Sequence, residues 1–142
     1  MNIKIVQTKE ELEDAYFVRK KVFIEEQNVP AEEEIDEFEK DATHFVLYND
    51  ERSPIGAGRF RILDGIGKVE RICVLSEGRN KGAGALIMKA IESYAADKGI
   101  EKLKLNGQTH AIPFYEKLHY RVASEEFLDA GIPHKTMIKE LK

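Results

Sequence analysis

The chain has 142 residues, of which 42% are hydrophobic and 34% charged, which are the proportions of one globular domain with its own core. The net charge of −4 argues against a general affinity for nucleic acid, and every apolar run is far shorter than the roughly 20 residues of a membrane span. The single cysteine, Cys73, excludes an internal disulfide, and no Cys/His spacing indicates a zinc site.

The first part of the chain is predicted to form a strand and then a helix. Residues 2–7 have the strand pattern, and residues 1–16 lack a basic segment followed by an apolar stretch, so we expect no secretory leader and a cytoplasmic protein. Thr8 and Glu11 have the spacing of a capping box, which predicts a helix that ends near Glu25.

The next segment, residues 27–43, is predicted to be an acidic loop or short helix. Two interpretations of the acidic residues between Glu25 and Asp41 stay open. They could favour a cationic substrate, or they could form a solvated helix face, which is the more common use of a charge run.

Three strands and a helix are predicted for the middle of the chain. The strands are residues 44–49, 54–63 and 67–75, and the short turns between them favour an antiparallel meander. After a glycine-rich turn, apolar residues from Ala83 onward recur at helical spacing, and Gly99 is placed to end that helix. A strand (101–108), a short helix (114–119) and two strands (120–124 and 134–141) complete the order β-α-β-β-β-α-β-α-β-β.

The turn from Ser76 to Gly84 has the composition of an anion-binding loop. A helix start presents unbonded N–H groups and a partial positive charge, and glycines at 82 and 84 let the main chain approach a ligand closely. Arg79 and Lys81 could add charge-assisted bonds to phosphates. The turn matches neither a P-loop nor a dinucleotide-binding motif, and a glycine turn with solvated charges is the alternative.

The sequence of this turn and its flanks resembles the GCN5-related N-acetyltransferase (GNAT) family. The family signature Q/R-x-x-G-x-G/A reads here Arg79-Asn80-Lys81-Gly82-Ala83-Gly84, preceded by "VERICVL" and followed by "LNGQTHAIPFYEKLHYRV". The resemblance covers nearly the whole chain, and its two ends are similar to a bacterial branch of uncharacterised members grouped with ElaA-like and glucosamine 6-phosphate N-acetyltransferase-like proteins. It implies an α/β (α+β) fold in one domain, residues 1–142, with a mixed, mostly antiparallel twisted sheet flanked by helices.

The resemblance also implies where acetyl-CoA, the co-substrate, is bound. In the family the signature binds the pyrophosphate, here through Arg79, Asn80, Lys81, Gly82, Ala83 and Gly84, and no metal is required. Main-chain groups of Ile72, Cys73 and Val74 are expected to pair with the pantetheine, with the Val74 N–H stabilising the thioester oxygen. Asn106 is expected near the cofactor, although an Asn before a Gly is also typical of a turn.

Two side chains are candidates for proton transfer in such a reaction. Tyr115 lies where the family has a tyrosine general acid for the CoA thiolate, and the alternative is a half-buried aromatic residue. Glu70 is the candidate general base, with a surface ion pair to a neighbouring Arg as the alternative. Cys73 is interpreted as core filler rather than a nucleophile, and His110 and His134 are expected near the acceptor cleft.

The function implied by this resemblance is direct acetyl transfer from acetyl-CoA to a primary amine in a ternary complex. The expected acceptor is a small-molecule amine, cationic if the acidic segment selects it, with neither nucleic acid nor membrane as a partner. Homodimers are common in the family, but no pattern in this sequence demonstrates one. The alternative is a non-catalytic module that binds acyl-CoA for sensing or assembly.

Overall fold

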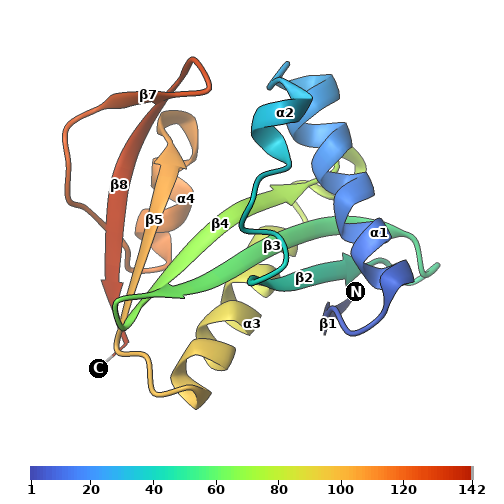
Figure 1. Cartoon of the computed structure of the whole chain (residues 1–142), viewed down its shortest axis with the longest axis horizontal. Helices are drawn as coiled ribbons and strands as arrows, with labels where there is room; N and C mark the ends of the chain where they lie inside the picture. The colour runs from blue at the N-terminus through green and yellow to red at the C-terminus, as the bar shows by residue number, and fades with distance from the viewer. Residues whose placement is uncertain (142) are drawn as a thin grey trace.

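The computed structural model describes residues 1–141, which form one eight-stranded sheet with helices on both faces (Figure 1). The helical elements are α1 (Lys9–Arg19), η1 (Lys20–Glu26), α2 (Ala31–Glu34), η2 (Ser76–Gly78), α3 (Ala83–Asp97), η3 (Thr109–Ala111) and α4 (Ile112–Lys117). The strands are β1 (Asn2–Ile5), β2 (Thr43–Tyr48), β3 (Pro54–Leu63), β4 (Ile66–Val74), β5 (Lys102–Gln108), β6 (Arg121–Val122), β7 (Phe127–Asp129) and β8 (Ile132–Glu140).

The strand order confirms the predicted mixed, mostly antiparallel sheet. It runs β1-β2-β3-β4-β5-β8-β6, and β7 pairs with β8. The β2-β3-β4 meander is antiparallel as expected, and β4 and β5 form the parallel pair. The sequence reading missed β7, because three residues are too few to show an alternating pattern. Ala130 and Gly131, both with positive φ, make the tight turn that folds β7 onto β8.

The first helical segment begins as predicted but changes type before it ends. Thr8 and Glu11 form both hydrogen bonds of the capping box at the start of α1. From Lys20 onward the backbone is π-helical, so the prediction of one continuous α-helix was wrong for its last part. The π-helix (i→i+5 hydrogen bonds) is rare and is frequently found at functional sites.

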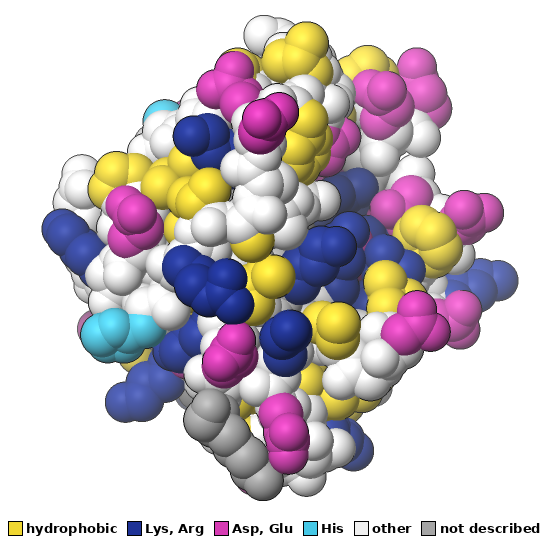
Figure 2. Space-filling view, turned by 90° about the vertical axis from the view of Figure 1, so that its left-hand side faces the viewer, with side chains coloured by type: hydrophobic (Ala, Val, Ile, Leu, Met, Phe, Trp, Pro, Cys, Tyr) yellow, Lys and Arg dark blue, Asp and Glu magenta, His cyan; other side chains and the backbone are white. Residues whose placement is uncertain are grey.

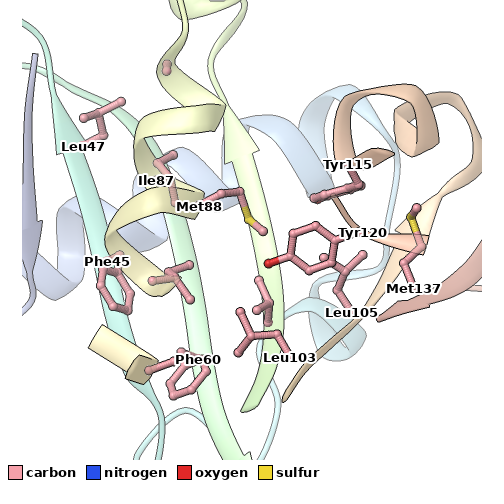
Figure 3. Packing of buried hydrophobic residues seen from close by; sticks show 14 of the residues in the cluster. Phe45, Leu47, Phe60, Ile87, Met88, Leu103, Leu105, Tyr115, Tyr120 and Met137 are labelled. Atoms are coloured by element: carbon pink, nitrogen blue, oxygen red, sulfur yellow. The ribbon is translucent and has the colours of Figure 1, made fainter. Parts of the chain in front are cut away.

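Two hydrophobic clusters fix the helices to opposite faces of the sheet. α3 lies on one face, where Ile87 and Met88 pack onto strand residues such as Phe45 and Phe60 (Figure 3). Gly99, with φ of 77°, follows the end of α3 as predicted. α1 covers the other face through a smaller cluster that includes Cys73. Within residues 1–141, every helix is too short or too polar to cross a lipid bilayer.

A β-bulge in β4 lies just beyond the point where β4 stops pairing with β5. Ala57 of β3 pairs with Cys73, but Arg59 pairs with Glu70, so β4 holds one residue more than β3 over this stretch. Arg71 takes up the irregularity with φ of 58°. β4 and β5 pair only at Gly67–Val69 with Leu103–Leu105 and then diverge, as Figure 1 shows.

Candidate active site

The gap between β4 and β5 leads into a large cavity. Its volume is about 1100 Å³, and its walls come from β4, β5, η1, α2, α4 and the β7–β8 hairpin. Among the sequence-predicted site residues, the structure brings seven to this cavity: Glu70, Ile72, Cys73, Val74, Arg79, Asn106 and Tyr115. The other predicted residues, Asn80, Lys81, Gly82, Ala83 and Gly84, do not line it; they follow Arg79 in the turn before α3 and in the first turn of that helix.

The main chain of β4 beyond the bulge has one paired edge and one open edge. Val74 and Cys73 are registered with Gly56 and Ala57 of β3, and the Leu75 N–H donates to the Ile55 carbonyl. Because successive N–H groups of a strand point to opposite sides, the Val74 N–H points away from β3. The strand therefore offers unpaired main-chain groups to the cavity.

Tyr115 reaches the cavity from α4 and is almost fully buried. Its side chain is 8% exposed, and its ring lies against Gly107 of β5, where an added Cβ would stand 3.2 Å from two ring carbons. The ring also packs against Phe114. It packs against Tyr120 as well, which Figure 3 shows beside it. Within residues 1–141 its hydroxyl has no hydrogen-bond partner. Burial raises the pKa of Tyr115, so the phenol stays protonated at neutral pH.

The turn before α3 has the backbone of an anion-binding loop. Asn80 and Gly82 have positive φ, 63° and 80°, and space is open around the position of a Gly82 Cβ. No side chain caps the first turn of α3, which begins at Ala83. Lys81 is exposed beside it. Free amides and open space at a helix start suit a phosphate group.

Gly84 and Arg79 have structural tasks that the sequence did not show. A Cβ on Gly84 would lie 3.0 Å from the Phe114 ring, so this glycine allows α4 to pack closely against α3. Arg79 donates to the Val74 carbonyl at 3.0 Å and pairs with Glu26 of η1 at 2.6 Å. The Arg79 guanidinium thus joins the end of β4 to η1.

Three members of the acidic segment, Glu34, Asp36 and Glu39, form ion pairs with buried arginines, an outcome that neither sequence interpretation anticipated. Arg19, 1% exposed, binds Glu34 at 2.9 Å and Glu39 at 2.7 Å. Arg59, also 1% exposed, makes bidentate bonds to Asp36 at 2.7 and 3.0 Å. These pairs hold residues 34–39 against α1 and β3.

Glu70 belongs to the same network. It accepts hydrogen bonds from Arg61 at 2.7 and 3.0 Å and from Arg59 at 3.1 Å, so the ion pair left open as its alternative is present. Burial alone would raise the pKa of Glu70, but the Arg61 hydrogen bonds and the Arg59 charge outweigh it and lower that pKa. Arg71 bonds to Glu34 and Asp36, so all three arginines are engaged by carboxylates of the protein itself.

Two further predicted residues are held by their neighbours. The Thr136 hydroxyl of β8 donates to the Asn106 side-chain oxygen at 2.9 Å, so Asn106 sits in a strand rather than a turn. Burial raises the pKa of the Cys73 thiol to about 12, which leaves it protonated and a poor nucleophile. This agrees with its interpretation as core filler.

A chain of hydrogen-bonded polar side chains joins two walls of the cavity. The Gln108 amide donates to the Gln27 side-chain oxygen at 2.8 Å, joining β5 to the end of η1. The His110 Nε2 donates to the Gln108 side-chain oxygen at 2.7 Å. The sequence placed His110 and His134 near a cleft but gave no sign of either glutamine, because the bond joins residues 81 positions apart.

The charge around this region is of both signs. Figure 2 shows Lys and Arg side chains gathered near the middle of the face that carries β8, with Asp and Glu side chains around them. Of the carboxylates that line the cavity, Glu34, Asp36, Glu70 and Glu26 are paired with arginines. Glu32, Glu33 and Asp129 line it as well and belong to no described ion pair within residues 1–141.

Comparison with known proteins gives concordant results for sequence and structure. Residues 6–141 match the family model described as an acetyltransferase (GNAT) domain. The chain is 57% identical over 141 residues to the uncharacterized N-acetyltransferase YjcF of Bacillus subtilis (strain 168), covering 99% of this chain and 100% of that protein. A Lactobacillus plantarum crystal structure, assigned as an N-acetyltransferase, superposes with a TM-score of 0.92 at 28% identity, covering 99% and 98% of the two chains. Escherichia coli ElaA shares the fold, with a TM-score of 0.83 at 19% identity over 99% and 100% of the chains.

Proposed function

The chain belongs to the GNAT acetyltransferase family, and from this premise we propose that it transfers the acetyl group of acetyl-CoA directly to a primary amine. The observation that carries the proposal is the open edge of β4 from Ile72 to Val74, which lines one cavity together with Tyr115. A strand edge orients an extended ligand, and a buried phenol beside it can supply a proton.

The described residues suit an extended, diphosphate-bearing thioester. The uncapped start of α3, with Gly82 in a left-handed conformation and open space around it, would receive the pyrophosphate. Lys81 is exposed beside it and would add charge. Arg79 would act mainly by fixing the end of β4, since its guanidinium already bonds to Val74 and Glu26. The main chain of residues 72–74 would then pair with the pantetheine.

Val74 and Tyr115 would serve the two ends of the reacting thioester. The Val74 N–H would donate to the thioester oxygen, where negative charge develops during attack. The Tyr115 hydroxyl would donate its proton to the departing thiolate. Burial raises its pKa, so the phenol holds its proton at neutral pH and is in the donor form when the thiolate leaves.

The acceptor would enter from the opposite face of the sheet, beside α2 and the β7–β8 hairpin. The carboxylates there that lie outside the arginine network are Glu32, Glu33 and Asp129. An amine that carries a second positive charge would be favoured by them, whereas a sugar phosphate would be repelled. We therefore propose a small cationic amine as the acceptor.

The test measures CoA release with a thiol reagent while a panel of amines is offered, including polyamines, amino sugars and aminoglycosides. We expect turnover with at least one cationic amine, and Tyr115→Phe should lower kcat about 100-fold while leaving acetyl-CoA affinity nearly unchanged. Calorimetry provides that affinity. A Tyr115→Phe protein with normal kcat would remove Tyr115 as the acid.

The panel also separates the enzyme from the non-catalytic alternative. A sensing or assembly module would bind acetyl-CoA in the calorimeter and release no CoA with any amine. Protein that neither binds acetyl-CoA nor releases CoA would contradict both functions.

A further inference from the structure

His134 of β8 is a buried imidazole with one nitrogen committed and one free. Its side chain is 8% exposed, and its ring stacks on Phe127 of β7 at an interplanar angle of 22°. The Nδ1 atom lies 2.6 Å from the Ile132 carbonyl. A carbonyl oxygen can only accept, so Nδ1 carries the hydrogen and Nε2 carries the lone pair of the neutral ring.

The free nitrogen of His134 is in contact with the cavity. Within residues 1–141 Nε2 has no hydrogen-bond or ion-pair partner. In the same range, the fully buried side-chain polar atom without a hydrogen-bond partner is Glu34 Oε1, and not His134 Nε2. The His134 Nε2 atom is therefore accessible to solvent. Because His134 lines the cavity, the cavity is the space to which Nε2 is exposed.

His134 and Tyr115 approach the gap in the sheet from opposite faces. Gly107 turns its Cα hydrogens toward the Tyr115 ring, so the next residue, Gln108, projects from the other face. His134 is the register partner of Gln108 on β8, and residues directly opposite each other share a face. A proton acceptor on the amine side and a proton donor on the thiolate side are thus separated by the sheet.

The other candidate bases near the acceptor are less suitable. Glu70 is held by Arg59 and Arg61, and its lowered pKa makes it a weak proton acceptor. His110 is exposed and uses its Nε2 to donate to Gln108. Resting on the transferase function proposed above, we propose that His134 Nε2 is the general base that removes the proton from the attacking amine.

The step balances without any further reactant. The amine nitrogen forms a bond to the thioester carbon, and the carbonyl electron pair moves to oxygen beside the Val74 N–H. His134 Nε2 takes one proton from that nitrogen. The carbon–oxygen double bond then re-forms, the carbon–sulfur bond breaks, and sulfur takes the proton of the Tyr115 hydroxyl. Solvent carries the proton from the His134 imidazolium back to the Tyr115 phenolate, so both side chains return to their starting states.

Charged groups from every neighbouring element face the same space and bear on the pH dependence. They are Asp129 from β7, His110 from η3, Glu26 from η1, Glu32, Glu33 and Glu34 from α2, Asp36 after α2, Lys68, Glu70 and Arg71 from β4, and Arg79 from the turn before α3. The test must therefore separate the contribution of His134 from theirs, which a single-residue variant measured across pH can do.

The main variant is His134→Asn, because the Asn amide can still donate to the Ile132 carbonyl but has no basic nitrogen. We expect its kcat to fall about 100-fold with the best amine, while acetyl-CoA affinity by calorimetry stays within about threefold. The wild-type kcat should decline on the acid side as the base is protonated, and this limb should be absent from the variant. His134→Gln provides a second variant if the Asn protein has a lowered Tm.

The control is His119→Asn, at an exposed position with φ of 75° that Asn tolerates and that does not line the cavity. It should retain wild-type kcat and the wild-type pH profile. An active wild type together with a folded His134 variant that keeps its kcat and its acid limb overturns the general base and leaves the transferase function standing. A wild type that releases no CoA with any amine overturns the transferase function and, with it, the base.

Discussion

The buried arginine on α1 gives the sharpest stability prediction. Arg19→Met keeps an apolar stem of similar length but removes the guanidinium, which donates to Glu34 and Glu39. The three side chains are 1%, 2% and 9% exposed, so the two carboxylates remain buried after the substitution. Glu39 would keep Arg59 at 3.0 Å, and Glu34 would keep Arg71 at 3.2 Å.

The expected loss in free energy of unfolding arises because two buried carboxylates lose a charged partner. Removal of one partner of a buried ion pair costs about 3–5 kcal/mol, a large share of the roughly 5–15 kcal/mol by which a domain is stable. Because two carboxylates lose their main partner but each keeps another arginine, we expect about 4 kcal/mol at pH 7. For a domain of this size the Tm should fall by about 10 °C.

The pH dependence distinguishes charge from packing. Burial alone would raise the pKa of Glu39, but the Arg19 hydrogen bonds lower it to about 2 in the folded protein, from an ordinary value of 4.5. This stability is present above pH 4.5 and is lost as the pH falls toward 2. In Arg19→Met burial is opposed by the Asp36 N–H and the Arg59 charge without the Arg19 bonds, so the folded pKa of Glu39 rises and the deficit should shrink on acidification.

Urea denaturation between pH 7 and pH 4 measures the difference in free energy of unfolding. Arg121→Met is the control, because its ion pair with Glu140 is exposed, 62% and 55%, and such pairs contribute about 0–1 kcal/mol. An Arg19→Met protein that loses no more stability than Arg121→Met, or whose deficit is the same at both pH values, would refute the reasoning.

Two further predictions concern the glycines before α3 and the buried thiol. Gly84→Ala should cost about 1–3 kcal/mol in chemical denaturation because its Cβ meets the Phe114 ring at 3.0 Å, and Phe114→Leu should recover part of the loss. Gly82→Val, where space is open but φ is 80°, should also cost stability because a β-branched residue is strained there, and it should in addition weaken acetyl-CoA binding in calorimetry; wild-type affinity would contradict the role of this turn. Cys73, with its pKa raised to about 12, should react with iodoacetamide at pH 8 only as fast as the protein unfolds, and mass spectrometry should find no acetyl group on it after incubation with acetyl-CoA.

Local patterns in the sequence were sufficient for most of the fold. The capping box at Thr8, the meander and the glycine that ends α3 each depend on residues a few positions apart, and all are present. β7 was missed because its three residues depend on a turn at Ala130 and Gly131. The change from α to π geometry at Lys20 has no sign in the hydrophobic spacing.

The side-chain network was beyond local patterns for a physical reason. Arg19 lies on the first helix, but its partners Glu34 and Glu39 are 15 and 20 residues away and come together with it only when the segment folds over α1. A charge run in a sequence does not reveal which of its members are neutralised. His134 was found near the cleft as expected, but its free nitrogen depends on the Ile132 carbonyl, which only the structure reveals.

The bulge at Arg71 makes the opening in the sheet depend on residue count rather than on residue type. If one residue between Glu70 and Cys73 were deleted, β4 could continue in regular register with Cys73 still opposite Ala57, but the irregularity at which β4 parts from β5 would be lost. Deletions in this short stretch should thus be far less tolerated during evolution than substitutions of its side chains, even where a deletion would leave a more regular fold.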